Sequence, residues 1–337
     1  MTQLLSTGLA TSIGSLPHTD AEAAAGVVLS RHPDLPAAPE LPNRSAREGM
    51  ISRAAQGISG VAVLDDGTLR VDREAVEDAL AEGVPVDATL GPPEHGGLLR
   101  FLERIEGRRG PVKIQLTGPV TLGLALSRAG VSSRVAFAVA AEAVQARARA
   151  VIDGVARHAP GAPVVVFVDE PSLAVVEHPG FPLPPHAVVD MLTGALASLH
   201  GAAATGVHCC GPTRWDLVLE ARPDILSLPV ALAGGLDAAL LGAFLTGGGW
   251  VAWGAVPTDA PVSDDVTFLW RRLLGAWSDL VRGGCPSLAL RERALVTPAC
   301  GLAGHGATQA ERALVLTAQL GERMREQATS RRLTIGA

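Results

Sequence analysis

Cysteine is scarce in this chain, which has only four among 337 residues and no C-x-x-C pair. Cys209 and Cys210 are adjacent, while Cys285 and Cys300 lie far along the chain. Small secreted domains held by disulfides carry many more cysteines, so a disulfide framework is excluded. Catalytic or metal-binding thiols are the better interpretation.

Long hydrophobic runs and blocks of positive charge are also missing. The longest apolar stretches, such as GAPVVVFVDEP at 161–171, are too short to span a bilayer, and residues 1–20 lack the basic start and apolar core of a secretory signal. The net charge is −6 and no dense block of lysine or arginine occurs, which excludes a groove for nucleic acid. We therefore expect a cytoplasmic protein that binds neither nucleic acid nor membrane.

What the chain does contain is a series of eight short apolar or β-branched runs, with 47% hydrophobic residues overall. The runs cover residues 10–17, 36–42, 111–119, 163–171, 205–211, 223–231, 249–257 and 294–301. Helical patterns separate most of them, for instance at 135–158, at 263–284 with Ser263 as N-cap, and at 308–328. This alternation predicts an α/β fold, a TIM-like (β/α)8 barrel. An open doubly wound sheet is the alternative, but no G-x-G-x-x-G follows the first run.

Residues 60–72 interrupt this alternation. Two extended runs flank Asp66-Gly67, a dipeptide typical of a tight hairpin turn. We therefore expect a small β-hairpin inserted into the barrel. The barrel is expected to fill residues 1–326 as a single catalytic domain, followed by a polar, frayed tail at 327–337.

The ends of the runs carry polar and sulfur-containing side chains, and chemistry in such barrels gathers where the strands end. His208 and Cys210 are two residues apart, so on an extended backbone they face the same side, and Cys300 ends the eighth run at the same rim. One imidazole and two thiolates favour zinc, with three protein ligands and one open position as in catalytic sites. On spacing alone, buried packing roles for these residues stay equally open, whereas Cys209 and Cys285 are interpreted as packing.

Two adjacent carboxylates, Asp169 and Glu170, end the run at 163–171. Adjacent strand residues face opposite sides, so we expect only one of them to enter the site. The alternative is a carboxylate that caps the turn before Pro171. At the end of the first run, Gly14 and Ser15 offer backbone N–H groups that can hold a carboxylate.

Five of these segments resemble motifs in the C-terminal catalytic domain of cobalamin-independent methionine synthase. They are TSIGSLPHT, KIQLTGPVTL, VDEP, HCC and TPACGL, in the family's order, from about Thr11 to about Glu326. The resemblance implies a TIM-like barrel of the kind shared with uroporphyrinogen decarboxylase. It also implies a methyltransferase that uses Zn2+ to activate a small thiol, homocysteine or a related one, as a thiolate.

For the metal, the resemblance implies zinc ligands at His208, Cys210 and Cys300. The family has a fourth, carboxylate ligand at the end of the next strand, where this chain has Pro229. The family's proton-donating histidine after the seventh strand has no counterpart in AWGAVPTDAP. The methyl donor is therefore left open between a folate and a corrinoid protein.

For the substrate, the resemblance implies that Ile13, Gly14 and Ser15 hold the carboxylate of an amino acid. It implies that Asp169 is the catalytic residue that holds the amine. A thiol bound in the open zinc position would lose its proton at neutral pH and attack the methyl group of the donor.

The segment ELPNRSAREGMISR partly matches a family segment with a substrate-binding glutamate, so Glu40 or Glu48 is expected in that role. Two other functions stay open. A metal-free, decarboxylase-like barrel would hold acidic substrates with arginines at its mouth, and Arg44, Arg47 and Arg53 are available. The third possibility is a non-enzymatic barrel with a structural zinc.

Overall fold

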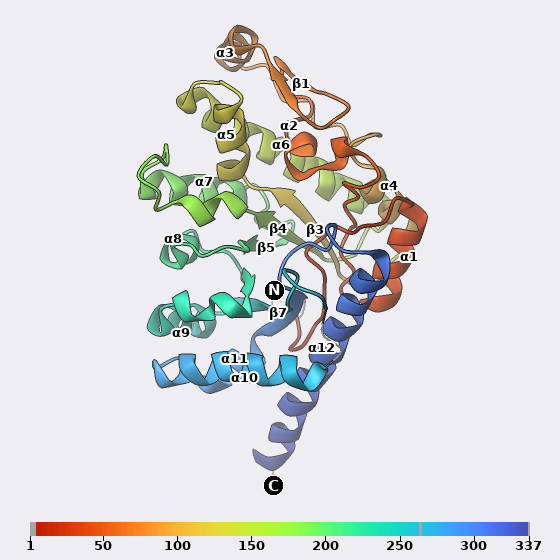
Figure 1. Ribbon diagram of the computed structural model, residues 1–337, viewed down its shortest axis with the longest axis vertical. Coiled ribbons are helices and arrows are strands. Elements are labelled where there is room, and N and C mark those ends of the chain that lie inside the picture. The colour runs from red at the N-terminus through yellow and green to blue at the C-terminus, as the bar shows by residue number, and fades with distance from the viewer. Residues whose placement is uncertain (1–4, 263–264, 336–337) are drawn as a thin grey trace.

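A curved parallel sheet surrounded by helices forms the centre of the molecule (Figure 1), and the computed structural model describes residues 5–262 and 265–335. Six strands follow one another in chain order and each pairs in parallel with the next. Nearly all of their residues are buried, which explains why the runs are continuously hydrophobic. The strands are β3 (Val112–Thr117), β4 (Val164–Asp169), β5 (Ala204–His208), β6 (Ile225–Pro229), β7 (Trp250–Val256) and β8 (Ala294–Pro298).

Helices cover the outside of this sheet. Figure 1 shows α7, α8, α9 and α10 stacked along one side of the strands and α1, α4 and α12 on the other. The α-helices are α1 (Ala21–Arg31), α2 (Met50–Ala55), α3 (Arg73–Glu82), α4 (Gly96–Arg104), α5 (Pro119–Arg128), α6 (Ser133–His158), α7 (Pro185–Ala197), α8 (Trp215–Glu220), α9 (Ala238–Thr246), α10 (Val266–Arg282), α11 (Ser287–Glu292) and α12 (Ala307–Ile335). Short 3-10 helices are η1 (Ala46–Glu48), η2 (Pro171–Val175) and η3 (Val230–Gly235).

The first two expected strands, at 10–17 and 36–42, are not strands in the structure. They lie between β8 and β3 and pair only through isolated bridges, so the sheet in the described residues has six strands rather than the eight of a complete (β/α)8 barrel. The parallel bridges are Ala10↔Val296, Ser15↔Glu40 and Ala37↔Lys113.

Proline and glycine explain why these two segments pair through single bridges instead of forming continuous strands. Pro36, Pro39 and Pro42 have no N–H to donate, so regular pairing cannot continue through them. Gly14 has φ of 148°, and a Cβ there would lie 2.2 Å from the Gln115 side chain, so only glycine fits. The segments nevertheless keep the positions that two barrel strands would occupy.

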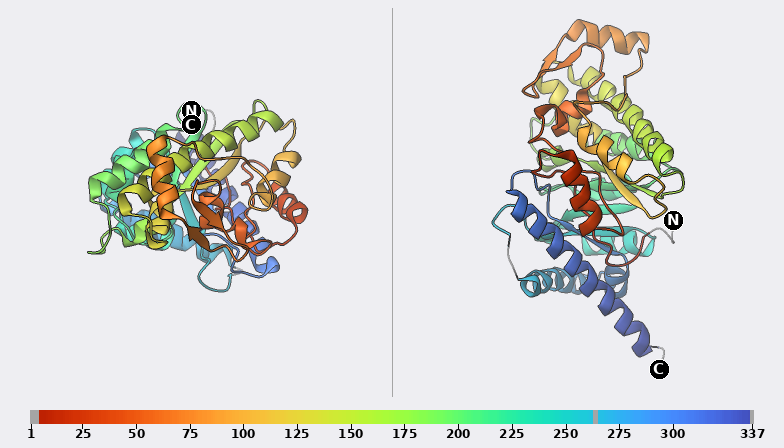
Figure 2. Two further views of the ribbon diagram at one scale, coloured as in Figure 1. Left: turned by 90° about the horizontal axis from the view of Figure 1, so that it is seen from above. Right: turned by 90° about the vertical axis from the view of Figure 1, so that its right-hand side faces the viewer.

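The expected hairpin is confirmed. β1 (Val61–Val63) pairs antiparallel with β2 (Leu69–Val71), and Gly67 takes a left-handed φ of 82° while its N–H donates to the Leu64 carbonyl at 2.9 Å. Val63 is buried in one cluster with residues of α3 and α6, which anchors the hairpin against these two helices. In the right-hand view of Figure 2 the hairpin and α3 form one end of the molecule.

The C-terminal helix extends past the expected domain boundary at residue 326. α12 continues through it as far as Ile335, so the backbone of the expected tail at 327–335 is helical rather than frayed. The expected N-cap Ser263 lies outside the described residues; α10 instead begins after Asp265, whose side chain accepts hydrogen bonds from the N–H groups of Thr267 and Phe268. No helix in the described part of the chain has both the length and the apolar character needed to cross a membrane.

Candidate metal centre

The three predicted metal ligands come together at the carboxyl ends of the strands. His208 is the last residue of β5, Cys210 follows two residues later, and Cys300 follows β8. Their ligand atoms all lie within 4.8 Å of one another. The sheet therefore brings together two segments that are 90 residues apart in sequence, as their positions at strand ends predicted.

Within the described part of the chain, one nitrogen of the His208 ring has a hydrogen-bond partner and the other has none. Its Nδ1 atom lies 3.0 Å from the hydroxyl oxygen of Ser227, which projects from the neighbouring strand β6. Its Nε2 atom is buried and has no hydrogen-bond partner among the described residues. A buried ring nitrogen without a partner is costly unless something else binds it, and a metal held with two thiolates satisfies this need.

The cysteines differ in their surroundings. The neighbouring Cys300 thiol and then the His208 ring stabilise the thiolate of Cys210 and lower its pKa to about 4, whereas the nearness of Cys210 raises the pKa of Cys300. Cys209 points away from this cluster, its thiol donating to the Gly211 carbonyl at 3.5 Å, and burial raises its pKa to about 12. Cys209 is thus a packing residue, as its alternation with Cys210 indicated.

Asp169 lies beside the cluster on β4, in register with His208. It is 3% exposed, and its Oδ1 atom has no partner among the described residues. Burial raises the pKa of Asp169 to about 7, while the positive charges of His208 and Lys113 act in the opposite direction. A buried carboxylate oxygen without a donor is well placed to accept a hydrogen bond from a cationic ligand.

Glu170 faces the other side of β4, as strand alternation predicted. It accepts hydrogen bonds from the N–H groups of Val120 and Thr121, at 2.9 and 2.7 Å, and from the Thr121 hydroxyl at 2.6 Å. Its carboxylate therefore caps the N-terminus of α5, not the turn before Pro171. Burial raises its pKa to about 7.

The segment that contains Ile13, Gly14 and Ser15 borders the metal ligands. The Ser15 side chain packs directly against Gly301, the residue after Cys300, because a Cβ on Gly301 would lie 2.0 Å from the Ser15 hydroxyl. No described residue accepts a hydrogen bond from the backbone N–H of Gly14 or Ser15. These two N–H groups are thus free for the predicted carboxylate.

Lys113 is a residue that the motifs did not reveal. This lysine, the only one in the chain, is fully buried inside the sheet. Its ammonium donates to the Ile13 carbonyl at 2.7 Å and to Gln115 at 3.1 Å, and lies 4.5 Å from the centre of the Phe167 ring. Burial lowers its pKa to about 8, opposed by the negative charge of Asp169. A single charged residue inside an apolar strand was the signal that could have identified it.

The two predicted glutamates both have partners within the protein. Glu40 forms an ion pair with Arg53. Glu48 accepts hydrogen bonds from the N–H groups of Leu41 and Gly97, at 3.3 and 3.2 Å, and pairs with Arg44. The Glu48 carboxylate is therefore occupied by the protein itself, whereas Glu40 lies at the bridge to Ser15 and closer to the site.

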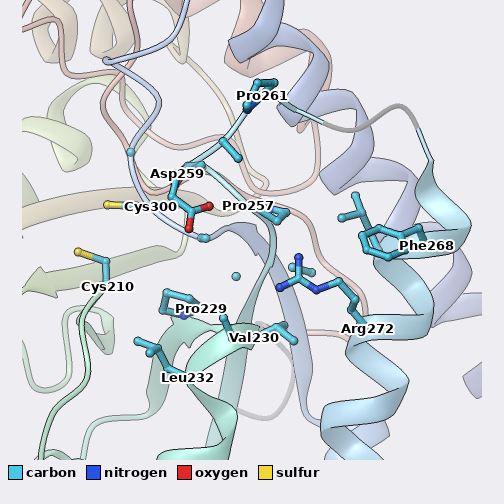
Figure 3. A pocket seen from close by; sticks show the side chains of 18 residues that line it. Cys210, Pro229, Val230, Leu232, Pro257, Asp259, Pro261, Phe268, Arg272 and Cys300 are labelled. Atoms are coloured by element: carbon cyan, nitrogen blue, oxygen red, sulfur yellow. The ribbon is translucent and has the colours of Figure 1, made fainter.

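A cavity of about 670 Å³ opens beside the two thiols (Figure 3). Pro229, at the position where a fourth ligand was considered, forms part of its wall. The other walls come from the residues that follow β6, β7 and β8 and from α10. The cavity shows that the cluster is accessible from one side. Its charged or aromatic lining residues are Asp259, Phe268 and Arg272.

Solved structures of B12-independent methionine synthases share this architecture. One, from Shewanella sp. W3-18-1 in complex with selenomethionine, gives a TM-score of 0.57 at 14% sequence identity, over 96% of this chain and 99% of that one. The chain has their fold. A putative vitamin-B12 independent methionine synthase from Listeria monocytogenes gives 0.60 at 12% identity, over 91% of this chain and 86% of the other. No protein-family profile and no curated protein matches the sequence.

Proposed function

We propose that the protein is a zinc-dependent methyltransferase that activates a small thiol, homocysteine or a similar one, for methyl transfer. The observation that carries the proposal is the His208, Cys210 and Cys300 cluster, with a buried, unpartnered imidazole nitrogen and a cavity next to both thiols. The fold likeness to methionine synthases supports it. The cytoplasmic location expected from the sequence stays a prediction.

The donor set suits zinc, since one imidazole and two thiolates match the three protein ligands of many catalytic zinc sites. When bound there, zinc would lower the pKa of a coordinated thiol and so supply a thiolate at neutral pH. The hydroxyl of Ser227 would fix the orientation of the His208 ring. Cys210 and Cys300 face the cavity through which the second reactant would approach.

The substrate would be held by the groups that have no partner of their own. The free N–H groups of Gly14 and Ser15 would bind the carboxylate of an amino-acid thiol, and the Ile13 carbonyl is held in place by Lys113. The buried Oδ1 atom of Asp169 would accept from the amine. Orientation of this kind contributes several kcal/mol to a bimolecular reaction, on the order of 7–11 in the best cases.

The two alternative functions have less support. A decarboxylase-like site needs free arginines, but Arg44, Arg47 and Arg53 pair with Glu48, Glu94 and Glu40, respectively. A closed structural zinc site would have four protein ligands, and only three side chains in the described residues form the cluster.

Metal content of the purified, reduced protein tests the proposal. We expect about one zinc per chain, lost in the Cys210→Ser, Cys300→Ser double variant and kept in the Cys209→Ala and Cys285→Ala controls. Homocysteine added to the cobalt-substituted protein should then change the cobalt absorption spectrum, because its sulfur joins the coordination shell. A protein that takes up no zinc, or a spectrum that homocysteine leaves unchanged, would refute the function proposed here.

A further inference from the structure

The cavity beside the thiols lies on a different side of the cluster from the predicted amino-acid groups. Cys210 and Cys300 line it, but Ile13, Ser15 and Asp169 do not. A thiol substrate held by those groups would reach the metal ligands from the side of β4 and the Gly14 segment. The cavity is therefore available for the second reactant, which must bring its methyl group to the sulfur.

Two side chains of opposite charge project into this cavity. Asp259 and Arg272 line the same cavity as Cys210 and Cys300, and Figure 3 shows the guanidinium of Arg272, from α10, turned toward the cavity. Arg272 contacts the ring of Phe268, 5.9 Å from its centre, and makes no ion pair with any described residue. A ligand that carries both a cationic and an anionic group matches this pair of charges.

The cavity wall has no histidine, lysine or tyrosine among its described residues. A loop imidazole, His305, donates from Nε2 to the carbonyl of the wall residue Thr258 at 3.0 Å and is not itself part of the wall. A leaving group that must be protonated would thus find no neutral or cationic general acid of suitable strength there. A leaving group that is already neutral when its bond to the methyl group breaks needs no general acid.

We propose that the methyl donor is a small onium carboxylate, a sulfonium or quaternary ammonium ion that also carries a carboxylate. Arg272 binds the carboxylate, and Asp259 together with the thiolates attracts the onium centre. The electron pair of the acceptor sulfur forms the new S–CH3 bond. The C–S⁺ or C–N⁺ bond breaks with its electron pair on the departing atom, which leaves as a neutral thioether or amine, so no proton moves. This inference rests on the proposed function.

The size of the cavity agrees with such a donor. About 670 Å³ lies within the range of roughly 300–1,000 Å³ that small-molecule sites occupy. A corrinoid macrocycle with its side chains is larger than the ligands such sites enclose. The donor is thus expected to enter the cavity whole rather than to dock above it.

Binding and transfer are measured separately on the zinc-loaded full-length chain. Dimethylsulfoniopropionate and glycine betaine are titrated by calorimetry with homocysteine present, and methyl transfer is followed by mass spectrometry. Arg272→Met should weaken binding of either carboxylate donor about tenfold or more, because it removes a charge-assisted hydrogen bond. Trimethylsulfonium, which has no carboxylate, should bind this variant as it binds the unmodified protein. Arg271→Met, the preceding residue of α10 and not part of the cavity wall, is the matched control.

The possible outcomes distinguish a wrong methyl donor from a wrong proposal of thiol activation. If homocysteine changes the cobalt spectrum but methyl groups come only from methyltetrahydrofolate or methylcobalamin, the onium donor is wrong and the thiol activation stands. The same holds if neither onium carboxylate binds, or if Arg272→Met and Arg271→Met bind them equally. If homocysteine leaves the spectrum unchanged, both proposals fall.

Discussion

At the scale of single residues, the most consequential contact is the one between His208 and Ser227. The hydroxyl at 3.0 Å from Nδ1 leaves Nε2 as the only nitrogen of the ring that can bind a metal. Partners of this kind fix the ring orientation of metal-binding histidines. In the proposed metal centre, Ser227 would orient a ligand without binding the metal itself.

Replacing Ser227 with alanine should weaken zinc binding by about 10- to 100-fold while leaving the fold intact. The measurement is a competition titration of the apoprotein with a zinc chelator. Thr297→Val removes another buried hydroxyl, one without a partner on strand β8, and should leave the affinity unchanged. Equal affinities for Ser227→Ala and the unmodified protein would mean that His208 does not depend on this contact.

The clustering of His208, Cys210 and Cys300 could be predicted from sequence because strand alternation and strand order bring them together. His208 and Cys210 share a face at any sheet position, and Cys300 joins them once its run is taken as the last strand. Arg272 and Asp259 could not be found in this way. They reach the cavity from α10 and from the loop after β7, whose positions depend on how the helix packs against the sheet.

At the scale of elements, the junction between β4 and α5 depends on one glycine. The Glu170 carboxylate reaches the first turn of α5 across Gly118, where an added Cβ would lie 2.2 Å from the carboxyl carbon. Only glycine leaves room for this buried cap. This contact could not be predicted from the GPVT and DEP segments, because Gly118 and Glu170 follow two different strands, β3 and β4.

Gly118→Ala should therefore lower the free energy of unfolding by about 1–3 kcal/mol, because the displaced carboxylate leaves buried N–H groups of α5 without an acceptor. Chemical denaturation followed by circular dichroism measures this change. Gly194→Ala in α7 is the control, since a Cβ there meets nothing within 4 Å. It should be neutral or stabilising by up to about 1 kcal/mol. Equal stability of the two variants would contradict the cap.

The same scale shows where the sequence prediction of strands was limited. Six of the eight runs became strands. The run at 36–42, with three prolines, and the run at 10–17, where Gly14 has a positive φ, kept their positions but pair only through isolated bridges. Periodicity and composition report where an extended segment lies. Whether it pairs regularly depends on each N–H, and three prolines between 36 and 42 remove donors that the neighbouring segment would need.

At the scale of the whole molecule, the two ends of the described chain are joined by α1 and α12, which lie side by side in Figures 1 and 2. His32, at the end of α1, donates from Nε2 to the Leu314 carbonyl of α12 at 3.0 Å, and Arg31 pairs with Glu311 at 3.1 Å. Burial lowers the pKa of His32 to about 4. Burial thus keeps His32 neutral, while its hydrogen bond to Leu314 acts in the opposite direction.

The burial of His32 predicts a loss of stability in mild acid. The unfolded chain binds a proton at His32 below its ordinary pKa of about 6.5, whereas the folded protein resists it down to about 4. The stabilisation is therefore complete above about pH 6.5 and is lost as the pH falls toward 4, by about 3 kcal/mol at most. Chemical denaturation at several pH values gives the free energy of unfolding as a function of pH. In this pH window, that free energy should change less steeply with pH in His32→Gln than in the unmodified protein. The exposed His200→Gln should keep the slope of the unmodified protein, and identical slopes in all three would be evidence against the linkage.

The burial of Lys113 also determines how the protein responds to amine-directed chemistry. The chain carries no other lysine, so every acylating reagent that targets a side-chain amine must reach the interior of the sheet. The folded molecule is shielded from such labels at that position, and reaction occurs only when the strands separate. The rate at which the Lys113 amine is acylated thus reports how often the sheet opens around it, with no engineered reporter needed.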